Sequence, residues 1–141
     1  MNRISAIALL AVAGFTATYR ASAQSLVTRA TVPFAFTVKG ITLPAGTYIV
    51  NSLAPDLMQI QSVDTKHPNA VTILTGEGSK WNPDAATELI FEAYGSQYFL
   101  HEIVCPMRTI DAKVPISQEE KKVASEWASR GGDQPVLVAL K

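Results

Sequence analysis

Apolar and polar or small side chains alternate along residues 30–50, and this is the clearest pattern in the chain. From Val32 to Val38 every second residue is apolar and large, a period that is typical of a strand with one buried face. Gly- and Pro-containing turns follow, and a second apolar run at the end of the stretch predicts another strand. The pattern therefore predicts strand, turn and strand, with Phe34 and Phe36 on the buried face.

Three later stretches carry similar patterns. Leu57–Ser62 predicts a strand with Met58 and Ile60 on one face, and Ala70–Leu74 predicts another that is rich in β-branched residues. The short connections between these strands favour an antiparallel meander over crossover connections. Residues 135–140 are nearly all apolar, which predicts a final strand that is buried on both faces or paired centrally.

A hairpin is predicted between Glu88 and Val104, with a two-residue turn at Gly95-Ser96. If Tyr94 pairs with Gln97 and the register continues along both strands, one face of the hairpin is a core face. That face holds Leu89, Phe91, Ala93, Tyr98 and Leu100, with Glu102 at its end.

The other face of this hairpin carries the most interesting polar group. In the same register His101 lies opposite Ile90, with Glu88 and Glu92 as its diagonal neighbours. Two carboxylates beside an imidazole favour its charged form, so we expect a raised His101 pKa. The group is interpretable as a weak metal site or as a solvated charge cluster. We favour the charge cluster, so no catalytic, cofactor-binding or metal-binding residue is assigned.

A helix is predicted from Ser117 to about Arg130. Ser117 and Glu120 have the spacing of a capping box, in which the serine accepts a bond from the Glu120 amide and the glutamate side chain returns to the Ser117 amide. Residues 131–132, both glycine, stop the helix. We interpret the helix as a cover over an open sheet end or edge. Its predicted buried stripe consists of Ile116, Val123 and Trp127.

The N-terminus has the pattern of a secretory signal peptide over residues 1–23. Arg3 precedes an uncharged apolar run, and small residues at Ala21 and Ala23 form a cleavage site before Gln24. The alternative is a membrane anchor, but the run is shorter than the roughly 20 residues that span a bilayer. We therefore expect an exported protein, periplasmic or secreted.

Residues 24–141 have the length of one domain with one core. The strand patterns predict an all-β domain, a compact barrel or sandwich of about seven mostly antiparallel strands with one C-terminal helix. Cleavage of the predicted signal peptide would remove Arg3 and Arg20 and leave ten basic residues against twelve acidic ones. The resulting net charge of about −2 argues against nucleic acid as a partner.

Two further residues are candidates for function. Cys105 is the only cysteine. It is either functional, as an intermolecular disulfide or a reactive thiol, or it is a buried and inert thiol. We favour the buried thiol because the local sequence offers no base. Trp81 stands among polar residues in the long connection 76–87. It either stacks on a ligand such as a sugar ring or folds back over the core.

The chain also resembles a family of small exported bacterial β-domain proteins. The resemblance is carried by the opening V-P-F-x-F-x-V-x-G-x-x-L-P-A-G-x-Y, by Tyr94-Gly95-Ser96-Gln97-Tyr98-Phe99-Leu100 and by the charged helix at 117–130. It covers nearly the whole chain after residue 23. The resemblance implies fold and export, and it implies no activity.

No catalytic signature is present: the chain lacks paired metal-ligand spacings, a phosphate-binding glycine loop and a nucleophile elbow. We therefore expect a non-enzymatic binding or structural module of the cell envelope, with an unknown protein or small molecule as its partner. The alternative is a small β-barrel that carries an apolar ligand.

Processing at the predicted site is directly testable. We expect N-terminal sequencing of the exported protein to begin at Gln24, with or without cyclisation to pyroglutamate, because signal peptidase cuts after the small residue at position 23. Exported protein that retains Met1 contradicts this prediction.

Overall fold

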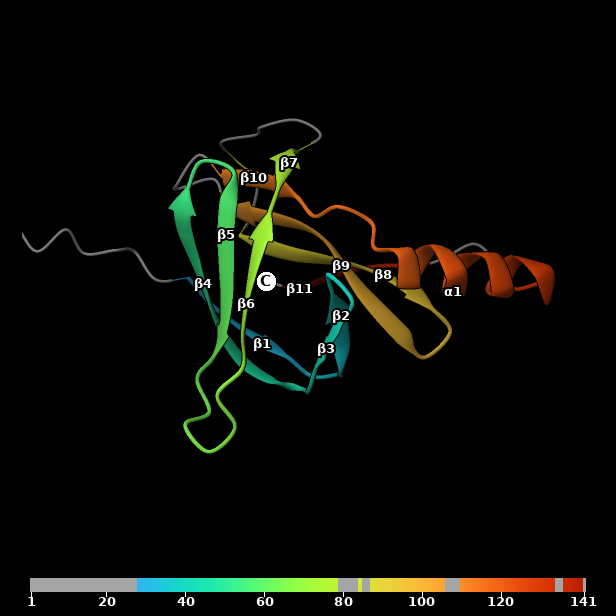
Figure 1. The fold of residues 1–141 in the computed structure, drawn as a ribbon, viewed down its shortest axis with the longest axis horizontal. Helices are drawn as coiled ribbons and strands as arrows, with labels where there is room; N and C mark the ends of the chain where they lie inside the picture. Colours follow the sequence, from blue (N-terminus) through green and yellow to red (C-terminus); the bar gives the residue numbers. More distant parts are fainter. Residues whose placement is uncertain (1–27, 79–83, 85–86, 106–109, 134–135, 141) are drawn as a thin grey trace, which may run out of the picture.

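The computed structural model describes residues 28–78, 84, 87–105, 110–133 and the backbone of 136–140. The predicted signal peptide, the site at Ala23 and Gln24 and the candidate Trp81 lie outside these residues. Two curled β-sheets and one helix make up the fold (Figure 1). The all-β class with a single C-terminal helix is confirmed.

The first sheet has four antiparallel strands in the order β1-β4-β5-β6. They are β1 (Thr28–Val32), β4 (Gly46–Ala54), β5 (Leu57–Ser62) and β6 (Ala70–Leu74). The predicted strands at 57–62 and 70–74 therefore have the expected bounds, and β4, β5 and β6 form the expected meander.

The second sheet has seven strands, with the path β11-β8-β9-β10-β7 and the pair β2 and β3 attached to β9. Its strands are β11 (Val136–Leu140), β8 (Glu88–Tyr94), β9 (Gln97–Cys105), β10 (Ile110–Lys113), β7 (Gly76–Glu77), β2 (Phe36–Val38) and β3 (Ile41–Leu43). Six of the predicted strands correspond to β4, β5, β6, β8, β9 and β11. The strand predicted over residues 32–38 instead spans the end of β1 and the whole of β2, and the short strands β3, β7 and β10 are additional.

The stretch predicted as one strand is divided at residues 33–35. β1 ends at Val32 and pairs with β4, whereas β2 begins at Phe36 and pairs in parallel with β9 in the other sheet. Pro33 favours this break, because proline has no backbone N–H to donate to a sheet. The alternation of burial survives the break, since both pieces face the same core.

The core lies between the two sheets and is built around aromatic contacts. Phe36 is 1% exposed and packs edge-to-face against Tyr48 and Phe91, with ring centroids 5.2 Å and 5.3 Å apart. Phe34 is only partly buried and stacks on Tyr98, with a centroid distance of 3.9 Å. Phe36 is therefore central, whereas Phe34 covers the margin of the core.

The final strand differs from expectation. β11 lies at the end of the second sheet, where it pairs with β8 only, so the prediction of central pairing is wrong. The other edge of β8 is already occupied by β9, the partner in its hairpin, so the returning chain adds to the outside. Long-range order of strands is not encoded in local hydrophobicity.

Helix α1 (Gln118–Ser129) has the predicted ends. The Ser117 hydroxyl accepts from the Glu120 amide at 3.1 Å. At the C-terminus, Gly131 has a φ of 70° and the amides of Gly131 and Gly132 bond to the carbonyls of Ala128 and Trp127. This pair of bonds is a Schellman motif.

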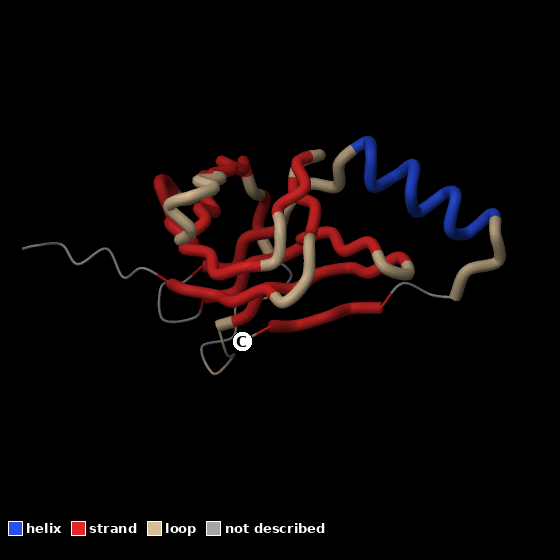
Figure 2. The backbone as a smooth tube through the Cα atoms, turned by 90° about the horizontal axis from the view of Figure 1, so that it is seen from below, coloured by secondary structure: helices blue, strands red, loops and turns tan. Residues whose placement is uncertain are grey.

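The helix lies at one end of the molecule beside the turn of the β8–β9 hairpin (Figure 2). Trp127 packs on that turn: a Cβ atom at Gly95 would lie 2.9 Å from the indole ring, so glycine permits the close contact. Val123 is half-buried, but Ile116 is 50% exposed. Its assignment to the buried stripe is wrong because Ile116 precedes the helix and does not follow its periodicity.

Among the described residues, no helix has the length and hydrophobicity needed to cross a membrane.

The packing predicts different costs for truncating the two phenylalanines of the opening stretch. We expect Phe36→Ala to lower the free energy of unfolding by about 3–5 kcal/mol, the usual range for a fully buried phenylalanine. Phe34→Ala should cost clearly less, because its ring is partly exposed. Chemical denaturation of both variants measures the difference, and a Phe36→Ala midpoint close to that of wild type contradicts the packing.

Candidate functional site

The candidate site begins with a β-bulge in the hairpin. The predicted register is correct from Tyr94–Gln97 to Phe91–Leu100, but then it shifts, and Ile90 pairs with Glu102. His101 is the extra residue that this shift leaves unpaired. The prediction that His101 lies opposite Ile90 is therefore wrong. A bulge bends its strand and changes the direction of a side chain, and bulges are common beside functional sites.

The bulge also changes which residue fills the end of the core. Glu102 was expected at the end of the core face, but it is only half-buried, and Ile103 takes the inward position opposite Leu89. Ile103 is 2% exposed. The extra residue thus keeps a carboxylate out of the core and places an apolar side chain there.

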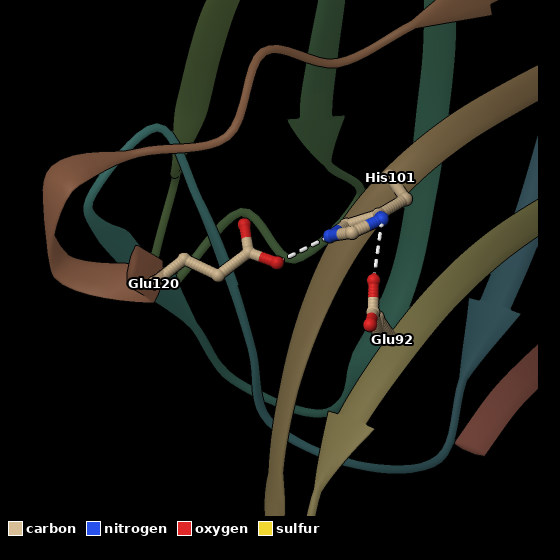
Figure 3. A group of neighbouring side chains, drawn as sticks. All are labelled: Glu92, His101 and Glu120. Atoms are coloured by element: carbon tan, nitrogen blue, oxygen red, sulfur yellow. Dashed lines mark hydrogen bonds and ion pairs between the residues drawn. The ribbon is translucent and has the colours of Figure 1, made fainter. Parts of the chain in front are cut away.

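His101 contacts two carboxylates, one at each ring nitrogen (Figure 3). Its Nδ1 lies 2.9 Å from Glu92 Oε2, and its Nε2 contacts Glu120 Oε1. The side chains of His101 and Glu92 are 18% and 19% exposed, and that of Glu120 is 4% exposed. We call these three residues the Glu–His–Glu cluster. It joins β8, the bulge of β9 and the first turn of α1.

Sequence reasoning found two members of this cluster and missed the third. Glu92 was predicted as a neighbour of His101, whereas Glu88, the second predicted neighbour, is not part of the cluster. Glu120 takes its place: the expected carboxylate of the capping box turns inward to His101. A signal was present, because Glu120 is three and seven residues before Val123 and Trp127 and so lies on their helical face.

The surroundings of His101 favour its charged form. The His101 pKa is raised above its ordinary value, and the hydrogen bond with Glu120 is the largest cause. The negative charges of Glu120 and Glu92 raise the pKa further, whereas partial burial and the positive charge of Lys113 lower it. The expected direction of the shift is thus confirmed, although the carboxylates are not the predicted pair. An imidazolium donates from both nitrogens, so the charged form satisfies both contacts.

The negative charge of the cluster reaches a neighbouring tyrosine. Burial is the main cause that raises the pKa of Tyr94 to about 12, and the charges of Glu92 and Glu120 raise it further. Tyr94 therefore stays neutral at physiological pH. It packs edge-to-face on Phe99, with ring centroids 5.8 Å apart.

The cluster also has the composition of a metal site. One ligand atom from each residue lies within 4.8 Å of the others, and imidazole with carboxylates is a donor set that suits zinc. However, the carboxylates contact opposite nitrogens of the ring (Figure 3). An ion on one nitrogen would displace a proton there and leave the other carboxylate at the far nitrogen. The geometry fits an imidazolium between two carboxylates better than a shared ion.

Cys105 is buried and unpaired with another cysteine, as expected. Its Sγ lies 3.6 Å from Thr28 Oγ1 and 3.8 Å from Thr87 Oγ1. Hydroxyl groups are not bases at neutral pH, so these neighbours do not activate the thiol. β9 is described as far as Cys105, and Pro106, which was predicted to end the strand, lies outside the described residues.

Comparisons with protein-family models, curated proteins and solved structures found no match to this chain. The resemblance to a family of small exported bacterial proteins therefore stays a prediction. The fold and the cluster themselves define the class of the protein: over the described residues it is a small all-β domain with a partly buried ion cluster that attaches α1 to the hairpin.

The Glu–His–Glu cluster predicts a measurable pH dependence. A raised folded-state pKa stabilises the protein fully below the unfolded value of about 6.5, and this contribution is lost as pH rises through the folded-state pKa. We expect an NMR titration of the His101 ring to give a pKa above 6.5. Glu120→Gln should lower that pKa, because it keeps a hydrogen-bonding side chain of the same size but removes the charge.

Zinc provides the second arm of this titration. We expect no saturable shift of the His101 ring signals at micromolar zinc, because the two carboxylates contact opposite nitrogens. A saturable shift that Glu92→Gln and Glu120→Gln both abolish would instead assign the cluster to metal binding. A His101 pKa at or below 6.5 would contradict the ion contacts themselves.

Proposed function

We propose that this protein is an exported, non-enzymatic binding or structural module of the cell envelope. Export is supported by the signal-peptide pattern of residues 1–23. A role other than catalysis is supported chiefly by the contacts within the Glu–His–Glu cluster. Its polar groups contact one another and hold α1 on the hairpin.

The geometry of His101 carries this proposal. A histidine acts as a general base when a neutral ring nitrogen faces a substrate. Here both nitrogens face carboxylates, and the surroundings favour the protonated ring. Glu120 is 3% exposed, which leaves its carboxylate little access to a molecule from solvent. The cluster is thus suited to fixing an element of the fold.

The alternative, a carrier of an apolar ligand, is less well supported by the cavities of the described residues. The pocket between the sheets beside Cys105 and Met58 has a volume of about 20 Å³. This is room for about one water molecule, whereas ligand pockets are typically about 300–1,000 Å³.

A larger hollow lies near the surface and is a better candidate for the binding surface. Its volume is about 610 Å³, and it lies between the turn of the β4–β5 hairpin and the strands β7 and β10. Leu53, which is 53% exposed, contributes an apolar side chain, and Asp56 and Glu77 contribute carboxylates. This combination suits a polar partner that presents both apolar and basic groups.

Native mass spectrometry of protein purified from its own cell envelope tests the proposal. We expect the spectrum to show the mature chain bound to a polar small molecule or to a protein partner. The Leu53→Arg variant should lack this bound species. Ile41→Arg is the matched control, because Ile41 is 49% exposed and is not among the residues lining the hollow. A retained lipid-like mass that neither substitution affects would support the carrier instead.

A further inference from the structure

Strand β6 is an edge of the first sheet. It pairs with β5 along its whole length, and no other strand of the described residues pairs with its second side. In Figure 1, β6 is the last strand of this sheet. A strand in this position presents unpaired backbone groups that another strand can bind.

The hydrogen bonds to β5 identify which backbone groups face outward. The amide of Ser62 donates to the carbonyl of Asn69 at 2.7 Å, and the amide of Thr75 donates to the carbonyl of Asp56 at 2.8 Å. Bonded and non-bonded pairs alternate in an antiparallel ladder, and the register between these two bonds is regular. The odd-numbered residues from 69 to 75 therefore bond to β5. The outward N–H and C=O groups belong to Ala70, Thr72 and Leu74.

This edge lacks the features that usually protect one. Its sequence A-V-T-I-L contains no charge and no proline, and its ladder with β5 has no bulge. Leu74 is 61% exposed, which is the largest value among the exposed large apolar residues. By contrast, β1 at the opposite edge carries Arg29 and contacts β11. Natural edges are commonly blocked by charges, prolines or bulges, and β6 has none of these.

The outward groups are complementary to a second copy of themselves. In an antiparallel pair centred on Thr72, Thr72 faces Thr72 of the other copy, and Ala70 faces Leu74. All three pairs then have their N–H and C=O groups directed at each other, so each pair forms both main-chain bonds. Opposite threonines also form a favourable cross-strand pair. A twofold axis generates this arrangement, because the same patch is used by both copies.

We propose that β6 binds β6 of a second copy and joins the two four-stranded sheets into one continuous antiparallel sheet. The contact is a single short strand, so its area lies below that of standard stable interfaces of about 1,200–2,000 Å². The dimer is accordingly weak and concentration-dependent. This interaction is independent of the hollow beside Leu53 and of the proposed binding function.

Sedimentation equilibrium of the mature chain over a range of concentrations tests the pairing and its register. We expect a reversible monomer–dimer equilibrium that Thr72→Lys abolishes, because the substitution places two positive charges opposite each other. The double variant A70K/L74E should dimerise, since each lysine then faces a glutamate. The variant A70K/L74K, which differs from it at one residue, should remain monomeric.

Gln61→Lys is the matched control for the added charge. Gln61 is exposed and pairs with Ala70 one strand further into the sheet, so this variant should dimerise like wild type. Circular dichroism checks that all variants stay folded. A wild-type chain that is monomeric at every concentration overturns the proposal, and so does a dimer that Thr72→Lys leaves unchanged. Native mass spectrometry of the Leu53→Arg variant tests the proposed binding function separately. The dimer and the binding function can therefore be contradicted independently of each other.

Discussion

The extra residue in β9 is the constraint on which the arrangement of this protein depends. Without the bulge at His101, the regular alternation would direct Glu102 into the core and Ile103 out of it. With the bulge, Ile103 is buried opposite Leu89, and His101 meets carboxylates from a neighbouring strand and from the helix. One backbone irregularity thus completes the core and brings the Glu–His–Glu cluster together.

The cluster explains how a short helix is held at the end of a small β-domain. Much of α1 is exposed: Glu119, Lys122 and Glu126 face solvent, as does the C-cap Arg130. Its attachment relies on Trp127 against the hairpin turn and on Glu120 against His101. A buried charge without a partner is strongly destabilising, whereas a paired one contributes little net stability but defines a geometry. The Glu–His–Glu cluster therefore determines where the helix lies more than how stable the protein is.

The two ends of the molecule have different properties. At the helical end, polar groups are paired internally and the surface is charged. The hollow beside Leu53 and the free edge of β6 both belong to the part of the fold away from α1, and they present apolar side chains and outward backbone groups. Interactions with other molecules are thus expected at the sheet end, and the cluster keeps the other end in place.

The sequence by itself determined the local features of this protein. Alternation and apolar runs located six of the seven longer strands, Gly95-Ser96 located the hairpin turn, and the cap at Ser117 with the glycines after Arg130 located the helix. These features depend on residues close together in the chain, whose conformational preferences act before any tertiary contact forms. The tertiary structure decided the pairing of β2 with β9, the bulge at His101, the edge positions of β6 and β11 and the inward turn of Glu120. Each depends on which distant segment becomes a neighbour, and a local pattern of polar and apolar residues contains no information about that neighbour.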